Sequence, residues 1–271
     1  MTTDALPALD DPVRLDPGAA AAYAADGHAL VRGLASPAQA AAYLPVIEAA
    51  ALATAWDKRP LAERDTYGRA FLQSFNLWRV DPAIARFVLS RRFARAAATL
   101  LGVDRVRLYH DQALCKEAGG GRTPWHQDQF YWPLDTDRTI TLWMPLVDVP
   151  NEVGSMTFAT GSHRLGDLRG RHISDESDAE FAALVAERGL PTFSYGALRA
   201  GDATFHAGWT IHSAGPNPTD RRRTVMTIIY VADGARVLRD VTPAQDRDRR
   251  VWLGDTPRGA LVDHELNPRL G

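Results

Sequence analysis

The spacing of hydrophobic residues predicts helices through most of the first hundred positions. Ser36-Pro37 marks one helix start, with serine at the cap and proline at the first helical position, and the apolar pattern continues to about residue 55. Asp81-Pro82 begins a second pattern, whose apolar stripe runs without a break to Gly102 and predicts one helix. We therefore expect residues 1–105 to form a mostly helical support.

From Val106 onward the pattern changes to short strands separated by turns. Apolar and β-branched residues recur in brief runs that are bounded by glycine, asparagine and aspartate. The expected strands are 106–115, 124–130, 139–147, 155–159, 203–206, 209–213 and 223–231. Many short strands with regular turns are typical of a β-sandwich or barrel.

The interval 162–200 interrupts this strand pattern. Apolar residues at helical spacing predict an amphipathic helix over 174–188 within it. Such an insertion is either a lid over a binding site or an inert excursion, and both interpretations stay open. Because no segment has the composition of a linker, we expect one domain over 1–271, with its β core over 106–232.

Composition narrows the classes of function. The chain has 271 residues, 45% of them hydrophobic and 24% charged, which is ample for a large core. A formal net charge of −2 argues against a general nucleic-acid or membrane-surface partner. One cysteine, Cys115, permits no intrachain disulfide, and the N-terminus has no secretory signal pattern. No apolar run has the length of a membrane span, so we expect a cytoplasmic protein.

The segment 123–132 holds an imidazole and a carboxylate two residues apart, among large aromatic residues. In an extended strand, His126 and Asp128 leave the same face. The same alternation predicts that Phe130 and Trp132 face the same side and form walls of a site, with core packing as the alternative for at least one of Phe130, Tyr131 and Trp132. Two histidines and one carboxylate form the metal-binding face of non-heme Fe(II) enzymes, so the pattern needs one more histidine.

His212 is the candidate for that second imidazole. It lies on a predicted strand that a turn-like segment separates from Arg221-Arg222-Arg223. Antiparallel pairing across this connection brings His212 close to Arg223. A buried arginine beside a metal matches a carboxylate bidentately. Two neutral imidazoles and one carboxylate leave Fe²⁺ with a charge of about +1, which favours an anionic co-substrate.

The remaining histidines do not extend this pattern. A lone histidine on a strand is most often an ordinary hydrogen-bonded side chain. We interpret four in this way, namely His28, His110, His172 and His264.

Taken together, these residues resemble the phytanoyl-CoA dioxygenase family of Fe(II)- and 2-oxoglutarate-dependent oxygenases. The resemblance covers roughly residues 70–232 and rests on His126-x-Asp128, His212 and Arg223, with Gly161-Ser162-His163 and Gly201-Asp202 between them. It implies a mainly β (α+β) fold, a double-stranded β-helix (jelly roll) with N-terminal and flanking helices. It also implies Fe(II), 2-oxoglutarate and O₂ as cofactor and co-substrates.

The resemblance assigns a role to each matching residue. His126, Asp128 and His212 would hold iron. Arg223 would pair with the distal carboxylate of 2-oxoglutarate, with Arg221 as the alternative because it has the same strand parity.

The resemblance also implies a lining for the co-substrate pocket, to which Gln112, Trp143 and Gln73 would contribute. Some family members have a serine two residues after the distal histidine, where this chain has Ala214. Halogenating relatives lack the metal carboxylate, whereas Asp128 is present here, which favours hydroxylation or another oxidation without halogen.

These inferences predict an oxygenase that hydroxylates or otherwise oxidises a small organic, natural-product-like molecule and releases succinate and CO₂. The alternative is a cupin-like metal-binding isomerase or ligand-binding module without redox turnover, which has no need of Arg223. The sequence shows no broad basic face for nucleic acid, no basic groove for coenzyme A and no feature that specifies an oligomeric state.

Overall fold

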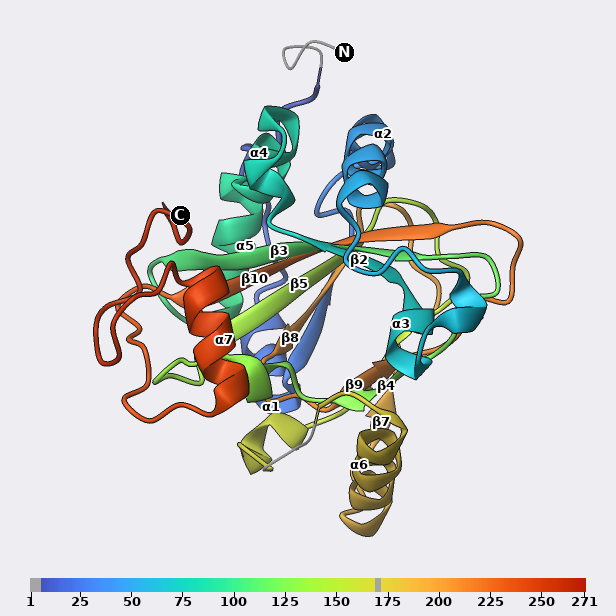
Figure 1. Cartoon of the computed structure of the whole chain (residues 1–271). Coiled ribbons are helices and arrows are strands. Elements are labelled where there is room, and N and C mark those ends of the chain that lie inside the picture. Colours follow the sequence, from blue (N-terminus) through green and yellow to red (C-terminus); the bar gives the residue numbers. More distant parts are fainter. Residues whose placement is uncertain (1–5, 169–171) are drawn as a thin grey trace.

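The computed structural model describes residues 6–168 and 172–271, which form two antiparallel sheets with helices around them (Figure 1). The large sheet has seven strands, β1 (His28–Val31), β8 (Ala203–Ala207), β5 (Thr139–Pro145), β10 (Arg223–Ala232), β3 (Val106–Lys116) and β11 (Arg269–Leu270) in spatial order, with β2 (Leu72–Phe75) also paired to β3. The small sheet has the order β4 (Thr123–His126), β9 (His212–Ala214), β6 (Met156–Ala159) and β7 (Thr192–Phe193).

Helices cover the face of the large sheet that is turned away from the small sheet. These are α1 (Ala19–Asp26), α2 (Pro37–Thr54), α4 (Pro82–Val88) and α5 (Arg91–Leu101), whose buried side chains share one core with β3, β5, β8 and β10. The short helices are α3 (Thr66–Ala70), η2 (Leu61–Glu63), η3 (Leu77–Arg79), η4 (Asp128–Tyr131) and η5 (Ser162–Leu165). Two further helices are α6 (Asp175–Glu187) and α7 (Pro243–Trp252). Among the described residues, no helix combines the length and apolar character needed to cross a membrane.

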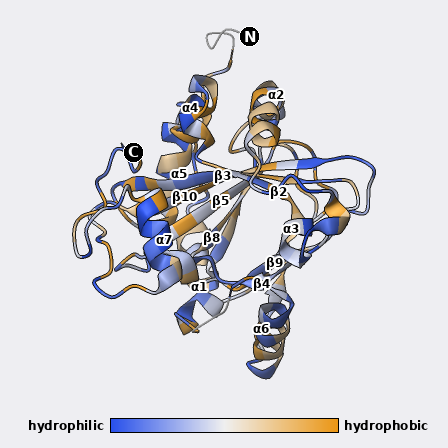
Figure 2. Cartoon of the chain, in the orientation of Figure 1, coloured by the Kyte–Doolittle hydropathy of each residue, from blue (hydrophilic) through white to orange (hydrophobic). Residues whose placement is uncertain are grey.

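Capping explains where α2 begins. The Ser36 hydroxyl accepts from the backbone N–H of Gln39 at 3.1 Å, and the Gln39 side chain accepts from the Ser36 N–H at 2.9 Å. This reciprocal pair satisfies two backbone donors at the helix start, as the sequence predicts. Figure 2 shows α2 coloured mostly hydrophobic, in keeping with its place on the sheet, whereas α7 is mostly hydrophilic.

Three predicted elements are wrong in part. The expected strand 209–213 begins only at His212, as β9. The expected single helix after Asp81-Pro82 is broken into α4 and α5, because the Ser90 hydroxyl caps a new helix by accepting from the Phe93 N–H. The expected strand 124–130 ends at His126, and η4 follows it. Strand alternation therefore does not apply beyond His126.

The sheets pack face to face through a second core. Leu114, Trp143 and Val225 of the large sheet contact Phe158 and Ala214 of the small sheet. Two packed antiparallel sheets with helices outside form the jelly roll that the sequence predicts. The space between the sheets contains the histidines of interest.

The helix of the insertion packs on the outside of the small sheet. The Asp178 carboxylate of α6 accepts from the backbone N–H of Trp125 in β4 at 2.8 Å. Phe181 and Val185 of α6 pack with Ala159 and with Ile211, the residue before β9. This helix therefore supports the strand that carries His126, and it does not cover the space between the sheets.

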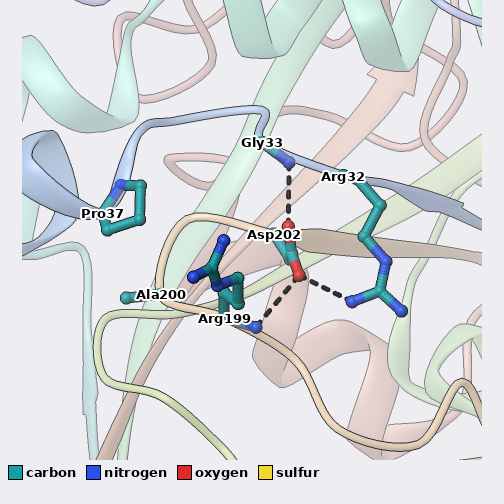
Figure 3. Close-up of a pocket in the computed structure, with 6 residues that line it drawn as sticks. All are labelled: Arg32, Gly33, Pro37, Arg199, Ala200 and Asp202. Atoms are coloured by element: carbon teal, nitrogen blue, oxygen red, sulfur yellow. Dashed lines mark hydrogen bonds and ion pairs between the residues drawn. The ribbon is translucent and has the colours of Figure 1, made fainter.

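The turn before β8 joins that strand to the end of β1 (Figure 3). The Asp202 carboxylate accepts from the backbone N–H groups of Gly33 at 2.8 Å and Arg199 at 3.0 Å, and from the Arg32 guanidinium at 2.8 Å. Gly201 has a φ of +87°, and a Cβ there would lie 2.1 Å from the Ala35 carbonyl oxygen, so only glycine fits. A surface hollow of ≈ 460 Å³ lies here, lined by Arg32, Gly33, Pro37, Arg199, Ala200 and Asp202.

Candidate active site

Two histidines face each other across the small sheet. His126 is the last residue of β4, His212 is the first of β9, and the two are direct cross-strand partners with ring centroids 4.1 Å apart. Asp128 follows as the first residue of η4. The spacing along the sequence predicts His126 and Asp128 on one strand. The structure instead brings them together through a turn into the 3-10 helix.

The three side chains offer their ligand atoms to one point. One atom from each of His126, Asp128 and His212 lies within 4.8 Å of the others. The Oδ1 atom of Asp128 is 3.4 Å from His126 Nε2 and 3.8 Å from His212 Nε2. Within the described residues, this is the one group of three or more histidine, cysteine or acidic side chains with metal-binding geometry.

Backbone contacts fix which ring nitrogens carry protons. His126 Nδ1 lies 2.7 Å from the Pro124 carbonyl oxygen, and His212 Nδ1 lies 2.9 Å from that of Thr210. A carbonyl oxygen only accepts, so each Nδ1 donates and each neutral ring presents a bare Nε2 lone pair. Burial, together with the neighbouring His126 and His206, holds the pKa of His212 well below its usual range, so this ring is neutral.

Two lone pairs and a carboxylate oxygen thus converge with no proton between them. Such an arrangement repels itself unless a cation lies at its centre, and imidazole nitrogen with carboxylate oxygen is a donor set that suits Fe(II). The residues His126, Asp128 and His212 therefore fit the metal that the sequence pattern implies. Their assignment as iron ligands stays a prediction.

The other carboxylate oxygen of Asp128 is held by the large sheet. Oδ2 accepts from His206 Nε2 and from the Thr141 hydroxyl, each at 3.1 Å. His206 and Thr141 are cross-strand partners on β8 and β5. Burial acts to raise the pKa of Asp128, but His212, His126 and His206 outweigh it and hold that pKa well below its usual range.

His206 is a site residue that the sequence argument did not identify. The available signal was its place on the predicted strand 203–206, only six positions before His212. Its Nδ1 is buried and has no hydrogen-bond partner among the described residues. Its ring centroid is 4.2 Å from that of His212, so the two large-sheet donors on Asp128 lie directly beside the predicted metal position.

Two buried cations lie at the other end of the space between the sheets. Arg223 begins β10, Lys116 ends β3, and they are direct cross-strand partners with exposures of 2% and 0%. Arg223 donates to the Gly154 carbonyl at 3.4 Å, and Lys116 donates to that of Gly121 at 2.5 Å. In the part of the chain that the structure describes, neither forms an ion pair with a carboxylate.

Burial of these cations has an electrostatic cost. It lowers the pKa of Arg223 to about 10, and burial with the repulsion of Arg223 lowers the pKa of Lys116 to about 6. The guanidinium also lies 5.2 Å from the centre of the Trp143 ring, and its Nε has no hydrogen-bond partner among the described residues. A bound carboxylate would supply both a counter-charge for the buried guanidinium and a hydrogen-bond acceptor for its Nε. Arg221, the alternative in the sequence argument, is exposed.

The predicted pocket-lining residues lie between these two ends. Gln112 of β3 and Trp143 of β5 are both cross-strand partners of Thr227 on β10, so the three form one row across the sheet. The Gln73 amide of β2 donates to the Gln112 side-chain oxygen at 2.7 Å. The structure thus brings Gln73, Gln112 and Trp143 to the inner face, and their contacts with a co-substrate stay predictions.

Thr123 offers a hydroxyl that the sequence argument missed. It is the cross-strand partner of Ala214, so both side chains leave the same face of the small sheet. Ala214 packs between the sheets, and the buried Thr123 Oγ1 has no hydrogen-bond partner among the described residues. A hydroxyl is therefore present beside the position where some family members have serine.

The aromatic residues after Asp128 do not follow strand alternation. Trp132 packs in a separate core with Tyr109, so it is not a wall of the metal site. Phe130 is half-buried and contacts Tyr131 and His172 with ring centroids 4.9 and 5.6 Å away. The prediction for Trp132 was wrong because η4 replaces the expected strand.

Comparison with known proteins agrees with this site. A family model described as phytanoyl-CoA dioxygenase (PhyH) matches residues 23–225. The chain is 29% identical over 161 residues to a probable alpha-ketoglutarate-dependent hypophosphite dioxygenase from Stutzerimonas stutzeri, which covers 56% of this chain and 54% of that protein. The chain spans about half the length of the curated relatives it matches.

Solved structures extend the likeness over nearly the whole chain. The non-heme alpha ketoglutarate-dependent epimerase SnoN from nogalamycin biosynthesis is 28% identical, with 94% of this chain and 100% of that chain covered and a TM-score of 0.76. SnoN in complex with Fe³⁺, alpha ketoglutarate and nogalamycin RO has the same identity and coverage and a TM-score of 0.71. Because the family model matches most of its length, the protein belongs to the phytanoyl-CoA dioxygenase family.

Proposed function

We propose that the protein is an Fe(II)- and 2-oxoglutarate-dependent oxygenase that hydroxylates or otherwise oxidises a small organic substrate and releases succinate and CO₂. The observation that carries the proposal is the convergence of two bare imidazole nitrogens and one carboxylate oxygen, from His126, His212 and Asp128. Membership of the family and the likeness to SnoN with Fe³⁺ and alpha ketoglutarate support the same activity.

When bound, iron and 2-oxoglutarate supply the activation of O₂ and the oxidation of the substrate. The chain supplies positions and charge. His126, His212 and Asp128 would hold the metal, while His206 and Thr141 donate to Asp128 Oδ2 and so orient this carboxylate toward the two imidazoles.

The co-substrate would extend from the metal toward Arg223 and Lys116. Its distal carboxylate would accept from the Arg223 guanidinium, as a charge-assisted pair in a buried place. Lys116, adjacent to Arg223 on the neighbouring strand, is a second basic side chain at this end, and an anion bound there would favour its protonated form. The Thr123 hydroxyl is placed to donate a further bond, which offsets the absence of a serine at Ala214.

A coupled assay tests the proposal. Succinate formed from 2-oxoglutarate is measured with added Fe(II) and ascorbate, in the presence and absence of O₂. Arg223→Met should reduce O₂-dependent succinate formation by about 100-fold or more, because it removes a buried charge partner of the co-substrate. Arg221→Met is the matched control, since this arginine is exposed two residues away.

The same assay separates the rival function. A cupin-like isomerase or ligand-binding module would bind metal through the histidines, form no succinate and tolerate Arg223→Met. Absence of succinate at saturating Fe(II), together with no binding of 2-oxoglutarate by calorimetry, would reject the oxygenase. The division of the chain into a helical support and a single β core stays a prediction of the sequence.

A further inference from the structure

Three rings from separate elements form a contiguous group beside the predicted metal site. Phe75 ends β2, His110 lies in β3 and Trp252 ends α7. The Trp252 ring centroid is 4.9 Å from that of Phe75 and 4.8 Å from that of His110, and Phe75 and His110 are 5.8 Å apart. We call Phe75, His110 and Trp252 the α7 ring group.

The register of the large sheet places this group next to the predicted co-substrate residues. Phe75 is the direct cross-strand partner of Gln112. His110 lies two residues before Gln112 on β3, so both side chains leave the same face. Phe75 therefore continues the row of Gln112, Thr227 and Trp143, and His110 lies on the side of Gln112 opposite to Lys116.

The α7 ring group is also connected to the segment that carries Asp128. Helix α7 packs against η4, which begins at Asp128. His110 and Thr141, which donates to Asp128 Oδ2, are both cross-strand partners of Ile229 on β10, so the imidazole lies in the same row of the inner face as that donor. Burial lowers the pKa of His110 to about 4. The α7 ring group thus borders the predicted metal from the side that faces α7.

The polar side chains around the rings are suited to hydrogen bonds with a neutral ligand rather than to ion pairs with a charged one. His110 is 3% exposed, and its Nδ1 has no hydrogen-bond partner among the described residues. The Tyr109 hydroxyl donates to Asp248 of α7 at 3.2 Å, and burial raises the pKa of Asp248 to about 7. Tyr131, three residues after Asp128, keeps its phenol neutral because burial raises its pKa to about 12.

Among the described residues, the unpaired buried lysine and arginine side chains lie elsewhere. Lys116 and Arg223 are at the opposite end of the space between the sheets. On α7, Arg249 is paired with Asp246, and Arg247, whose charge acts to lower the pKa of Asp248 and of Tyr131, is exposed. An anionic substrate group buried against the rings would lack a buried cationic partner. Its desolvation would then cost on the order of several kcal/mol. The surroundings of the rings therefore disfavour an anion.

Helix α7 contributes Trp252 and Asp248, which are outside the predicted metal and co-substrate residues. Substrate selectivity differs within a family that shares its chemistry, so the remaining walls of the site are the place to look for it.

We propose that the primary substrate is a neutral ring compound bearing keto or hydroxyl groups, and that it binds between Asp128 and the α7 ring group, stacked on Phe75 and Trp252. Its oxygen atoms would exchange hydrogen bonds with His110 and Tyr131. The inference rests on the proposed function and adds the substrate class to it. It excludes an acyl-coenzyme A and a small inorganic anion such as the hypophosphite named for one relative.

Equilibrium binding tests the substrate class. The protein is loaded with Fe(II) and 2-oxoglutarate under nitrogen, where no turnover occurs, and is titrated in a calorimeter. The probes are 2-(hydroxymethyl)anthraquinone, octanoyl-coenzyme A and sodium hypophosphite. We expect the anthraquinone to bind with a Kd on the order of micromolar and the two anions to give no specific heat. Tighter binding of either anion, or no binding of the anthraquinone, would overturn the inference.

Variants locate the binding. Trp252→Ala should weaken anthraquinone binding about five- to tenfold, because it removes a stacking surface, whereas Trp252→Phe should stay within about twofold. Trp56→Ala is the matched control, since that ring is 86% exposed and distant in sequence. If Trp252→Ala fails to fold, Phe75→Leu carries the same expectation. Equal affinity of the variants and the wild type would show that the probe binds elsewhere and refute the placement.

Two results separate this inference from the function beneath it. The affinity for 2-oxoglutarate is measured in the same samples and should be unchanged by Trp252→Ala, because that residue lies at the other end of the site from Arg223. Normal 2-oxoglutarate binding with no anthraquinone binding rejects the substrate class alone. Loss of 2-oxoglutarate binding in the wild type rejects the proposed function instead.

Discussion

The two ends of the space between the sheets are incomplete in opposite senses. At one end His126, His212 and Asp128 direct lone pairs at a common point, which requires a cation. At the other end Lys116 and Arg223 lie side by side without a carboxylate partner in the part of the chain that the structure describes, which requires an anion. A protein that bore only one of these ends would be a metal site or an anion site.

The difference predicts a ligand that joins the two ends. Buried unpaired charges are costly, and the cost of each end is offset only when its counterpart binds. Each end can therefore be altered separately, and its effect on the other measured.

Removing the carboxylate should affect the metal end most. In Asp128→Ala the metal loses one of three ligands, and the affinity for Fe(II) or for a Zn(II) probe should fall by more than about 100-fold. Metal titration by calorimetry measures the change. Unaltered affinity would show that Asp128 is not a metal ligand, and the comparison of a metal end with a basic end would then fail.

Removing a supporting bond should have a smaller effect at the same end. His206→Leu leaves the three predicted ligands intact but removes a donor from Asp128 Oδ2, and metal affinity should fall about tenfold to 100-fold. Thr141→Val removes the other donor and should act in the same direction. Circular dichroism checks that both variants fold. A fall no larger than experimental error would mean that the large sheet does not orient the carboxylate.

At the end that holds Lys116 and Arg223, we expect a pH dependence of the free energy of unfolding. The pKa of Lys116 is lowered from its usual value to about 6 in the folded protein, so between pH 6 and about 10 the unfolded chain binds one more proton at this residue. Stability contributed by this lysine therefore rises with pH, by about 1.4 kcal/mol per pH unit, which is tenfold in the folding equilibrium.

Urea unfolding at pH 6.5, 7.5 and 8.5 measures this dependence. The free energy of unfolding of the wild type, relative to Lys116→Met, should increase across the series, and 2-oxoglutarate should flatten it by supplying an anion. The comparison with Lys116→Met removes contributions from other groups, such as Asp248. Parallel pH profiles for the two proteins would show that Lys116 is charged and paired in the folded state.

The smallest effect is expected at Thr123. Thr123→Val preserves the shape of the side chain but removes the hydroxyl, so 2-oxoglutarate affinity should fall about fivefold, as for the loss of one hydrogen bond. Metal affinity should be unchanged, which distinguishes this variant from Asp128→Ala. Thr123→Ser should restore the wild-type value, and failure of this rescue would mean that the valine acts through packing.

Much of the fold was predictable because it follows from local patterns. The capped start of α2 at Ser36 and the long strands β3 and β10 all have local signals that the structure confirms. The break at Ser90 was missed because the apolar stripe continues through it, although serine is a common cap. Helix α7 has a readable start, Thr242-Pro243 with Gln245 in a capping box, that the sequence argument did not use.

The site was predictable only as far as spacing along the chain carries it. His126 and Asp128 meet for a reason other than the predicted strand, because a turn into η4 also brings residues two apart together. The donors on Asp128, His206 and Thr141, come from cross-strand pairing, and a single sequence does not reveal register. The same limit hid the pairing of Lys116 with Arg223.

The short strand β11 has a consequence for the behaviour of the protein in solution. Arg269 and Leu270 pair with Arg107 and Val106 on β3, while β2 pairs with the other half of the same strand. Without β11, the first residues of β3 would present unpaired backbone donors and acceptors at an apolar sheet edge, which invites other chains to add to it. Trimming the last three residues should therefore promote self-association on storage before it alters any property of the metal site.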